Sequence, residues 1–172
     1  MIRNQALSVQ AVVTPHGLLA TRQEAATDET FLFSLFESVK GPDFARMPVD
    51  DRMKTQLLRM QYSAMTQSYR ASFPDASFAI ITMDGAPIGR LITDVTQDRL
   101  HIVLVAFLPD WRHRNLGSAL MRQVLTQART RGLTCEATVA LDNIPSRRLW
   151  ARLDFIERSR DAANVILIRS WS

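Results

Sequence analysis

The chain has 172 residues, of which 47% are hydrophobic and 22% charged, and a net charge of +4. These values are ordinary for one globular domain with a core of its own. The single cysteine, Cys135, excludes an intramolecular disulfide and a cysteine-based metal centre. No stretch is apolar for long enough to cross a bilayer, and the N-terminus lacks the apolar run of a signal peptide, so we expect a cytoplasmic protein without membrane contact.

The first half of the sequence predicts a short extension followed by a strand and two helices. Residues 1–17 alternate weakly and are expected to form an N-terminal extension or an edge strand, while 18–172 form a single domain. After a strand over 18–23, Thr27 is expected to cap a helix that ends at Gly41-Pro42. A second helical region is predicted over 48–70, with Pro48 early and acidic residues in its first turn.

The rest of the sequence predicts six strands and two helices. Asp84-Gly85 is a strong hairpin signal between two apolar runs, and Gly132 is placed to end a helix. One strand–helix–strand crossover links the halves, so we predict a mixed α/β fold: a central mixed sheet with helices on both faces. The expected strands span residues 77–83, 86–96, 99–108, 133–141, 155–158 and 164–169, and the expected helices span 115–131 and 143–153.

The most informative stretch is the turn between the strand ending at Leu108 and the next helix. A helix N-terminus has backbone N–H groups without intrahelical partners, and its dipole favours anions. Arg112 and Arg114 flank this turn, and Gly117 lets a phosphate approach without meeting a Cβ. The sequence therefore predicts a phosphate site here, in preference to a solvated basic turn.

Two motifs in this order resemble the GCN5-related N-acetyltransferase (GNAT) superfamily. Arg112-His113-Arg114-Asn115-Leu116-Gly117 is similar to its Arg/Gln-x-x-Gly-x-Gly/Ala turn. The segment from Asn143 to Phe155 is similar to its Asn-x-x-Ala-x-x-x-Tyr-x-x-x-Gly-Phe helix. By element order the resemblance covers about residues 18–170.

The resemblance implies the GNAT-type acyl-CoA N-acyltransferase fold and transfer of an acetyl group from acetyl-CoA to a primary amine. In that family the strand before the turn splays from its neighbour and pairs with pantetheine, the turn holds the pyrophosphate, and no metal is needed. Many relatives pair through sheet edges or the C-terminal hairpin, which makes a homodimer one expectation. Carried over, the cofactor-binding residues are Val105, Phe107, Arg112, His113, Arg114, Asn115, Leu116, Gly117, Ser118, Asn143 and Trp150.

Four positions depart from the family pattern. Asn115 and Asp154 replace glycines, and Ser146 replaces a small alanine. Asparagine adopts a positive φ more readily than most residues, so the turn can keep its shape. Trp150 replaces the tyrosine that often protonates the leaving thiolate, and an indole N–H does not titrate in a useful range.

No residue receives a catalytic assignment from the sequence. His101 could deprotonate the incoming amine, although a histidine packed on a strand face is the preferred interpretation. Tyr62 and Tyr69 could supply a proton, but packing with a hydrogen-bonded hydroxyl is favoured. Cys135 is expected to be a small core residue. The acceptor is an amine of unknown identity, and the alternative function is a catalytically weakened or inactive GNAT-fold protein that binds CoA or another protein.

Overall fold

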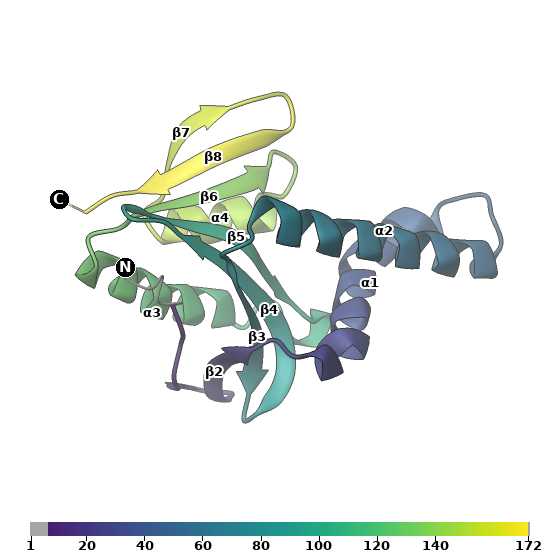
Figure 1. Cartoon of the computed structure of the whole chain (residues 1–172), viewed down its shortest axis with the longest axis horizontal. Helices are drawn as coiled ribbons and strands as arrows, with labels where there is room; N and C mark the ends of the chain where they lie inside the picture. Colours follow the sequence, from purple (N-terminus) through teal and green to yellow (C-terminus); the bar gives the residue numbers. More distant parts are fainter. Residues whose placement is uncertain (1–6, 172) are drawn as a thin grey trace.

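The computed structural model describes residues 7–171, which form four α-helices, two short 3₁₀ helices and eight strands (Figure 1). The helices are η1 (Ala26–Asp28), α1 (Glu29–Ala45), α2 (Asp51–Ser72), η2 (Pro109–Trp111), α3 (Leu116–Thr130) and α4 (Ile144–Arg152). The strands are β1 (Val12–Thr14), β2 (Gly17–Gln23), β3 (Ser77–Met83), β4 (Ala86–Val95), β5 (Arg99–Phe107), β6 (Thr134–Ala140), β7 (Ile156–Arg160) and β8 (Asn164–Arg169).

The eight strands form one sheet in the order β1-β2-β3-β4-β5-β6-β8-β7. Every neighbouring pair is antiparallel except β5 and β6, which are parallel and joined through α3. The predicted mixed α/β fold is therefore confirmed. β1 lies at the edge of the sheet, and residues 1–6 of the expected N-terminal extension lie outside the described residues. The division of the chain at residue 17 stays a prediction.

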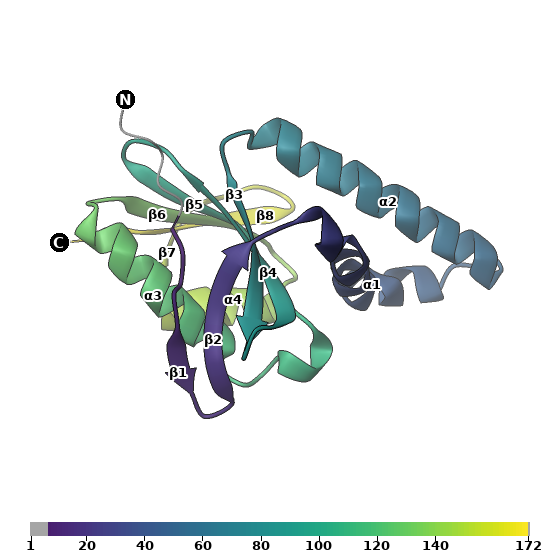
Figure 2. The ribbon, with the colours of Figure 1, turned by 60° about the horizontal axis from the view of Figure 1, so that its bottom comes forward.

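The helices cover the two faces of the sheet in pairs (Figures 1 and 2). On one face, α3 and α4 contribute Leu120, Val124 and Trp150 to the main core, which also contains side chains from the strands. On the other face, α1 and α2 pack together over Ile80 of β3 in a smaller cluster. The amphipathic spacing of these helices explains the arrangement, since each turns an apolar stripe to the sheet. Within residues 7–171, no helix has the length and apolarity needed to span a membrane.

The sheet opens between β5 and β6. Only residues 99–102 of β5 are paired with β6, and the pairing ends at Ile102. In the ladder between β4 and β5 the register shifts there, because Ile92 faces Leu104 and Thr93 faces Ile102, so Val103 is the extra residue of a bulge. A bulge bends a strand and increases its twist. Residues 104–107 therefore pair with β4 along one edge, and the opposite edge of residues 103–107 is free.

Two predicted boundaries of the first helix are wrong. The helix begins after Asp28 rather than Thr27, because the Asp28 carboxylate accepts the backbone N–H of Ala25 and pairs with Arg22 at 2.7 Å. It also continues through Pro42 to Ala45. A proline inside a helix removes one hydrogen bond, and packing of Phe44 against the cluster between α1 and α2 offsets that loss.

Candidate functional site

A cleft of about 700 Å³ lies where the free part of β5, the following turn, the first residues of α3 and α4, and the helices α1 and α2 meet. Most of the residues predicted to bind a cofactor line it. They are Val105, Phe107, Arg112, His113, Asn115, Leu116, Gly117, Ser118 and Asn143. Arg114 and Trp150 are not among the lining residues.

The turn before α3 has the backbone of an anion-binding loop. His113 and Asn115 have φ values of 59° and 58°, so left-handed residues alternate through the turn. The first bond of α3 runs from the N–H of Ala119 to the carbonyl of Asn115. The N–H groups of residues 116–118 are thus the unpaired donors of the helix, and the positive end of the helix dipole lies in the cleft. Asparagine takes up the conformation for which the family uses glycine.

The two arginines of the turn are engaged with the protein itself. The Arg112 guanidinium donates to the carbonyl of Phe107 at 2.8 Å and to Oγ of Ser38 at 3.1 Å. This fastens the turn to the end of β5 and to α1. The Arg114 guanidinium lies 5.3 Å from the ring centre of Trp111, where a cation is attracted to the ring face. The donors aimed at a ligand are therefore chiefly backbone N–H groups.

The start of α4 forms another wall of the cleft. Oδ1 of Asn143 accepts the backbone N–H of Ser146 at 3.2 Å, so Asn143 is the N-cap of α4 and also lines the cleft. At the other end of this helical segment, Asp154 has a φ of 59° and pairs with Arg169 at 3.3 Å. The aspartate thus occupies the left-handed conformation of the glycine that it replaces.

Trp150 belongs to the core. Its side chain is only 2% exposed, and its ring centre lies 4.9 Å from that of Phe155. The indole therefore contributes packing between α4 and the sheet. Its predicted place beside a cofactor stays untested.

The part of the cleft under α2 contains two tyrosines and a buried arginine. Tyr62 donates its hydroxyl hydrogen to Oε2 of Glu29 at 3.1 Å; burial, followed by the negative charge of Glu29, raises the pKa of Tyr62 to about 12. Burial likewise raises the pKa of Tyr69. Both hydroxyls are therefore protonated at neutral pH, and both side chains line the cleft beside Arg90.

Arg90 is a charged lining residue that the sequence interpretation missed. Its side chain is 3% exposed and pairs with Glu24 at 2.8 Å, and Glu24 also pairs with Arg70 at 2.9 Å. The signal was a charged residue in the middle of the otherwise apolar run 86–92. A buried charge is costly unless it is paired, so an arginine at such a position is informative.

His101 and Cys135 do not line the cleft. The His101 ring lies edge-on to Phe73 at 5.5 Å, its Nε2 is buried and has no hydrogen-bond partner among residues 7–171, and burial lowers its pKa. Cys135 is buried, and burial raises the pKa of its thiol to about 12. Neither position supports a role in a reaction inside the cleft.

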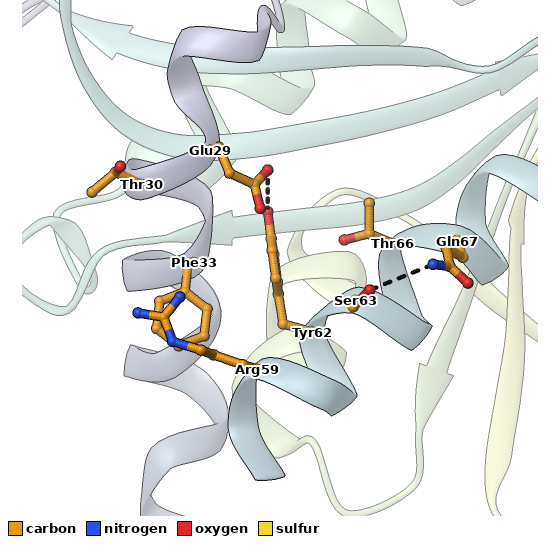
Figure 3. A pocket seen from close by; sticks show the side chains of 8 residues that line it. All are labelled: Glu29, Thr30, Phe33, Arg59, Tyr62, Ser63, Thr66 and Gln67. Carbon is orange, nitrogen blue, oxygen red and sulfur yellow. Dashed lines mark hydrogen bonds between the residues drawn. The ribbon is translucent and has the colours of Figure 1, made fainter. Parts of the chain in front are cut away.

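A smaller hollow of about 420 Å³ lies between α1 and α2 (Figure 3). Tyr62 stands in the wall that it shares with the cleft, and Arg59 covers the ring of Phe33 with its guanidinium 4.4 Å from the ring centre. In the described part of the chain, no cluster of histidine, cysteine or carboxylate side chains could hold a metal ion.

Comparison with known proteins gives partial sequence matches and many structural ones. Aspartate/glutamate leucyltransferases of Brucella abortus, from strains S19 and 2308, are 34% identical over 91 residues, or 53% of this chain. The matched region spans only 32% of those relatives' own length.

Three solved structures are similar in fold at low sequence identity. The PaiA N-acetyltransferase of Thermoplasma acidophilum in complex with coenzyme A has a TM-score of 0.66 at 16% identity, covering 89% of this chain and 99% of its own. RimJ of Mycobacterium smegmatis in complex with CoA-disulfide has a TM-score of 0.64 at 17% identity, covering 95% and 87%. Naa50 of Arabidopsis thaliana in complex with the bisubstrate analogue CoA-Ac-MVNAL has a TM-score of 0.58 at 12% identity, covering 89% and 99%.

The family comparison covers most of the chain that builds the cleft, apart from the cleft residues of α1. Residues 44–155 match the Acetyltransferase (GNAT) family, and this range contains the free part of β5, the turn before α3 and all of α4. With its fold and its family match in agreement, this chain belongs to the GNAT acetyltransferase family.

Proposed function

We propose that this protein is an N-acetyltransferase that transfers an acetyl group from acetyl-CoA to a primary amine. The observation that carries the proposal is the junction of two features in one cleft. A strand with a free edge, residues 103–107, leads through the turn to the start of α3, where the backbone N–H groups of residues 116–118 have no intrahelical partner. An extended amide-containing chain fits the strand edge, and a diphosphate fits the helix N-terminus.

The same residues define how the cofactor would be held. The N–H groups of the turn and of residues 116–118 would bind the pyrophosphate, and the free edge of β5 would pair with the pantetheine amides. Gly117 lines the cleft, so its missing side chain leaves room for the phosphate oxygens. Asn143 would add a contact from the start of α4 while it continues to cap that helix.

Bound acetyl-CoA supplies an activated acyl group, so the protein has mainly to position an amine against it. Backbone N–H groups on the free edge of β5 can polarise the thioester carbonyl. Proton transfer to the leaving thiolate cannot come from Trp150, since an indole is not an acid in this range. Of the cleft tyrosines, Tyr62 already donates to Glu29. We therefore propose that water protonates the thiolate, and we name no catalytic residue.

The alternative is a GNAT-fold protein that binds CoA or a protein partner without catalysis. The departures from the family motifs at positions 115, 150 and 154 are the reason for this alternative. Asn115 in the turn and Asp154 after α4 nevertheless have the left-handed backbone that suits the glycines they replace. This retained geometry favours the enzyme. The relatives named aspartate/glutamate leucyltransferase transfer a leucyl group rather than an acetyl group, so the experiment also tests the identity of the acyl donor. We continue to predict a cytoplasmic location.

Calorimetric titration of the full chain with acetyl-CoA, and in parallel with CoA, tests the proposal. Micromolar binding of both is expected, followed by release of free thiol when an amine mixture is added. An absence of binding at millimolar concentration would refute the cofactor site. Binding without thiol release, against a broad amine panel, would support the non-catalytic alternative.

A further inference from the structure

The charged side chains that line the cleft are all positive. Lys40, Arg90, Arg112 and Arg152 contribute to its walls, and within the described chain no aspartate or glutamate lines it. A polyamine or a lysine-rich peptide would therefore find no counter-charge there. This sign pattern restricts the acceptor to amines that do not depend on a carboxylate of the protein.

Among these cations, Arg90 is the one that a strand of the sheet contributes. Arg112 is committed to Phe107 and Ser38 through its own hydrogen bonds. Arg90 lies on β4 directly opposite Ala106 of the free segment of β5. Neighbouring strands are about 5 Å apart, so Arg90 is one strand away from the proposed pantetheine edge. Tyr62 and Tyr69 line the cleft beside it.

The charge of Arg90 is only partly balanced. Its Nε and Nη2 donate to Glu24, but Glu24 also accepts from Arg70, so the three side chains carry a net charge of +1. In the described structure, Nη1 of Arg90 makes no hydrogen bond. Glu29, the carboxylate nearest to Tyr62, accepts the tyrosine hydroxyl and lines the neighbouring hollow instead of the cleft. A buried cation with a spare donor is suited to bind an anionic group.

We propose that the acceptor amine carries a carboxylate a few bonds from its nitrogen and that Arg90 binds this carboxylate. A free amino acid and a peptide with N-terminal Asp or Glu both have this chemistry. The inference rests on the proposed function, because it concerns the acceptor side of the same cleft. It names Arg90 as a residue that determines specificity, held in place by Glu24.

Acceptor pairs that differ only in the carboxylate test the assignment. Thiol release from acetyl-CoA is measured with each amino acid and its amide, and with short peptide amides that begin with Asp or Asn, and with Glu or Gln. The carboxylate member of a pair is expected to have at least a tenfold higher kcat/KM. Preference among free amino acids points to a small-molecule acceptor, and preference only among the peptides points to a protein N-terminus.

Two variants separate recognition from stability. Arg90→Gln combined with Glu24→Gln removes the buried pair together, which avoids leaving an unpaired buried carboxylate. It is expected to abolish the carboxylate preference while keeping acetyl-CoA affinity. Arg70→Gln is the matched control: Arg70 pairs with the same glutamate but does not line the cleft, so the preference should persist.

A second readout does not require turnover. Each compound of a pair is added at millimolar concentration, with and without CoA, and the shift in Tm is measured; the carboxylate member should raise the Tm more. Equal effects of both members, a preference that survives in the Arg90/Glu24 double variant, or no effect of any compound would overturn the inference. Turnover of neutral amines would then leave the acetyltransferase proposal standing, whereas failure of acetyl-CoA to bind would refute that proposal separately.

Discussion

Replacing Gly117 by glutamate is expected to abolish acetyl-CoA binding without unfolding the protein. Gly117 is the second residue of α3, and a Cβ built there lies 3.4 Å from Leu149 and 3.7 Å from Phe107, both ordinary contacts. A carboxylate in the first turn of a helix stabilises it by about 0.3–1 kcal/mol, and loss of glycine adds about 0.5–1 kcal/mol. The Tm should therefore not fall.

The loss of affinity can be worked out from charge. A carboxylate about 5 Å from one phosphate charge costs about 3 kcal/mol at an effective dielectric constant of about 20, which corresponds to more than a hundredfold in Kd. Calorimetry with acetyl-CoA measures the loss, and thermal unfolding checks the fold. Gly117→Gln is the matched control, because it adds the same bulk without charge and should lose less affinity. Unchanged binding in Gly117→Glu would refute the assignment of the turn to the pyrophosphate.

Further predictions concern the strands and the core. Gly89→Ala should lower the Tm by several degrees, because its Cβ would lie 2.3 Å from a carbonyl oxygen of β5, whereas Gly41→Ala meets only a side-chain carbon at 3.8 Å and should not. Trp150→Tyr should give no gain in turnover. Urea titration should show that this variant is about 1–3 kcal/mol less stable, because packing is lost and a hydroxyl is buried. A clear gain in turnover would contradict the core position of residue 150. Because burial lowers the pKa of His101, the unfolded chain binds a proton below the ordinary value of 6.5 that the folded chain does not, so stability should fall as the pH drops below that value. His101→Gln should flatten this dependence and the exposed His16→Gln should not; an equal slope in both would refute the explanation.

The sequence was sufficient to predict most of the fold because the local signals agree with one another. Asp84-Gly85 forms the expected hairpin between β3 and β4, and the turn before α3 follows the strand where it was predicted. The expectation that Asn115 can replace a glycine is consistent with its left-handed backbone. Such features depend on residues close together in the chain, which a sequence pattern records directly.

The features that the sequence did not predict have a common physical origin, which is contact between distant segments. Pro42 does not end its helix because Phe44 packs, partly buried, against the cluster between α1 and α2, and no local rule contains that contact. The placement of Trp150 in the core depends on how α4 rotates over the sheet. The sequence did not predict that Arg90 lines the cleft, because its partner, Glu24, lies 66 residues away.

The short parallel ladder between β5 and β6 also has a consequence for folding. β1 to β5 form one block of sequence neighbours, and β6 to β8 form another, and only four register pairs connect the two within the sheet. Each block can be expected to open as a cooperative unit of its own. A ligand that pairs with the free edge of β5 while contacting α4 would tie the blocks together. Binding should therefore slow hydrogen exchange in β6 and β8, although no residue of these strands lines the cleft.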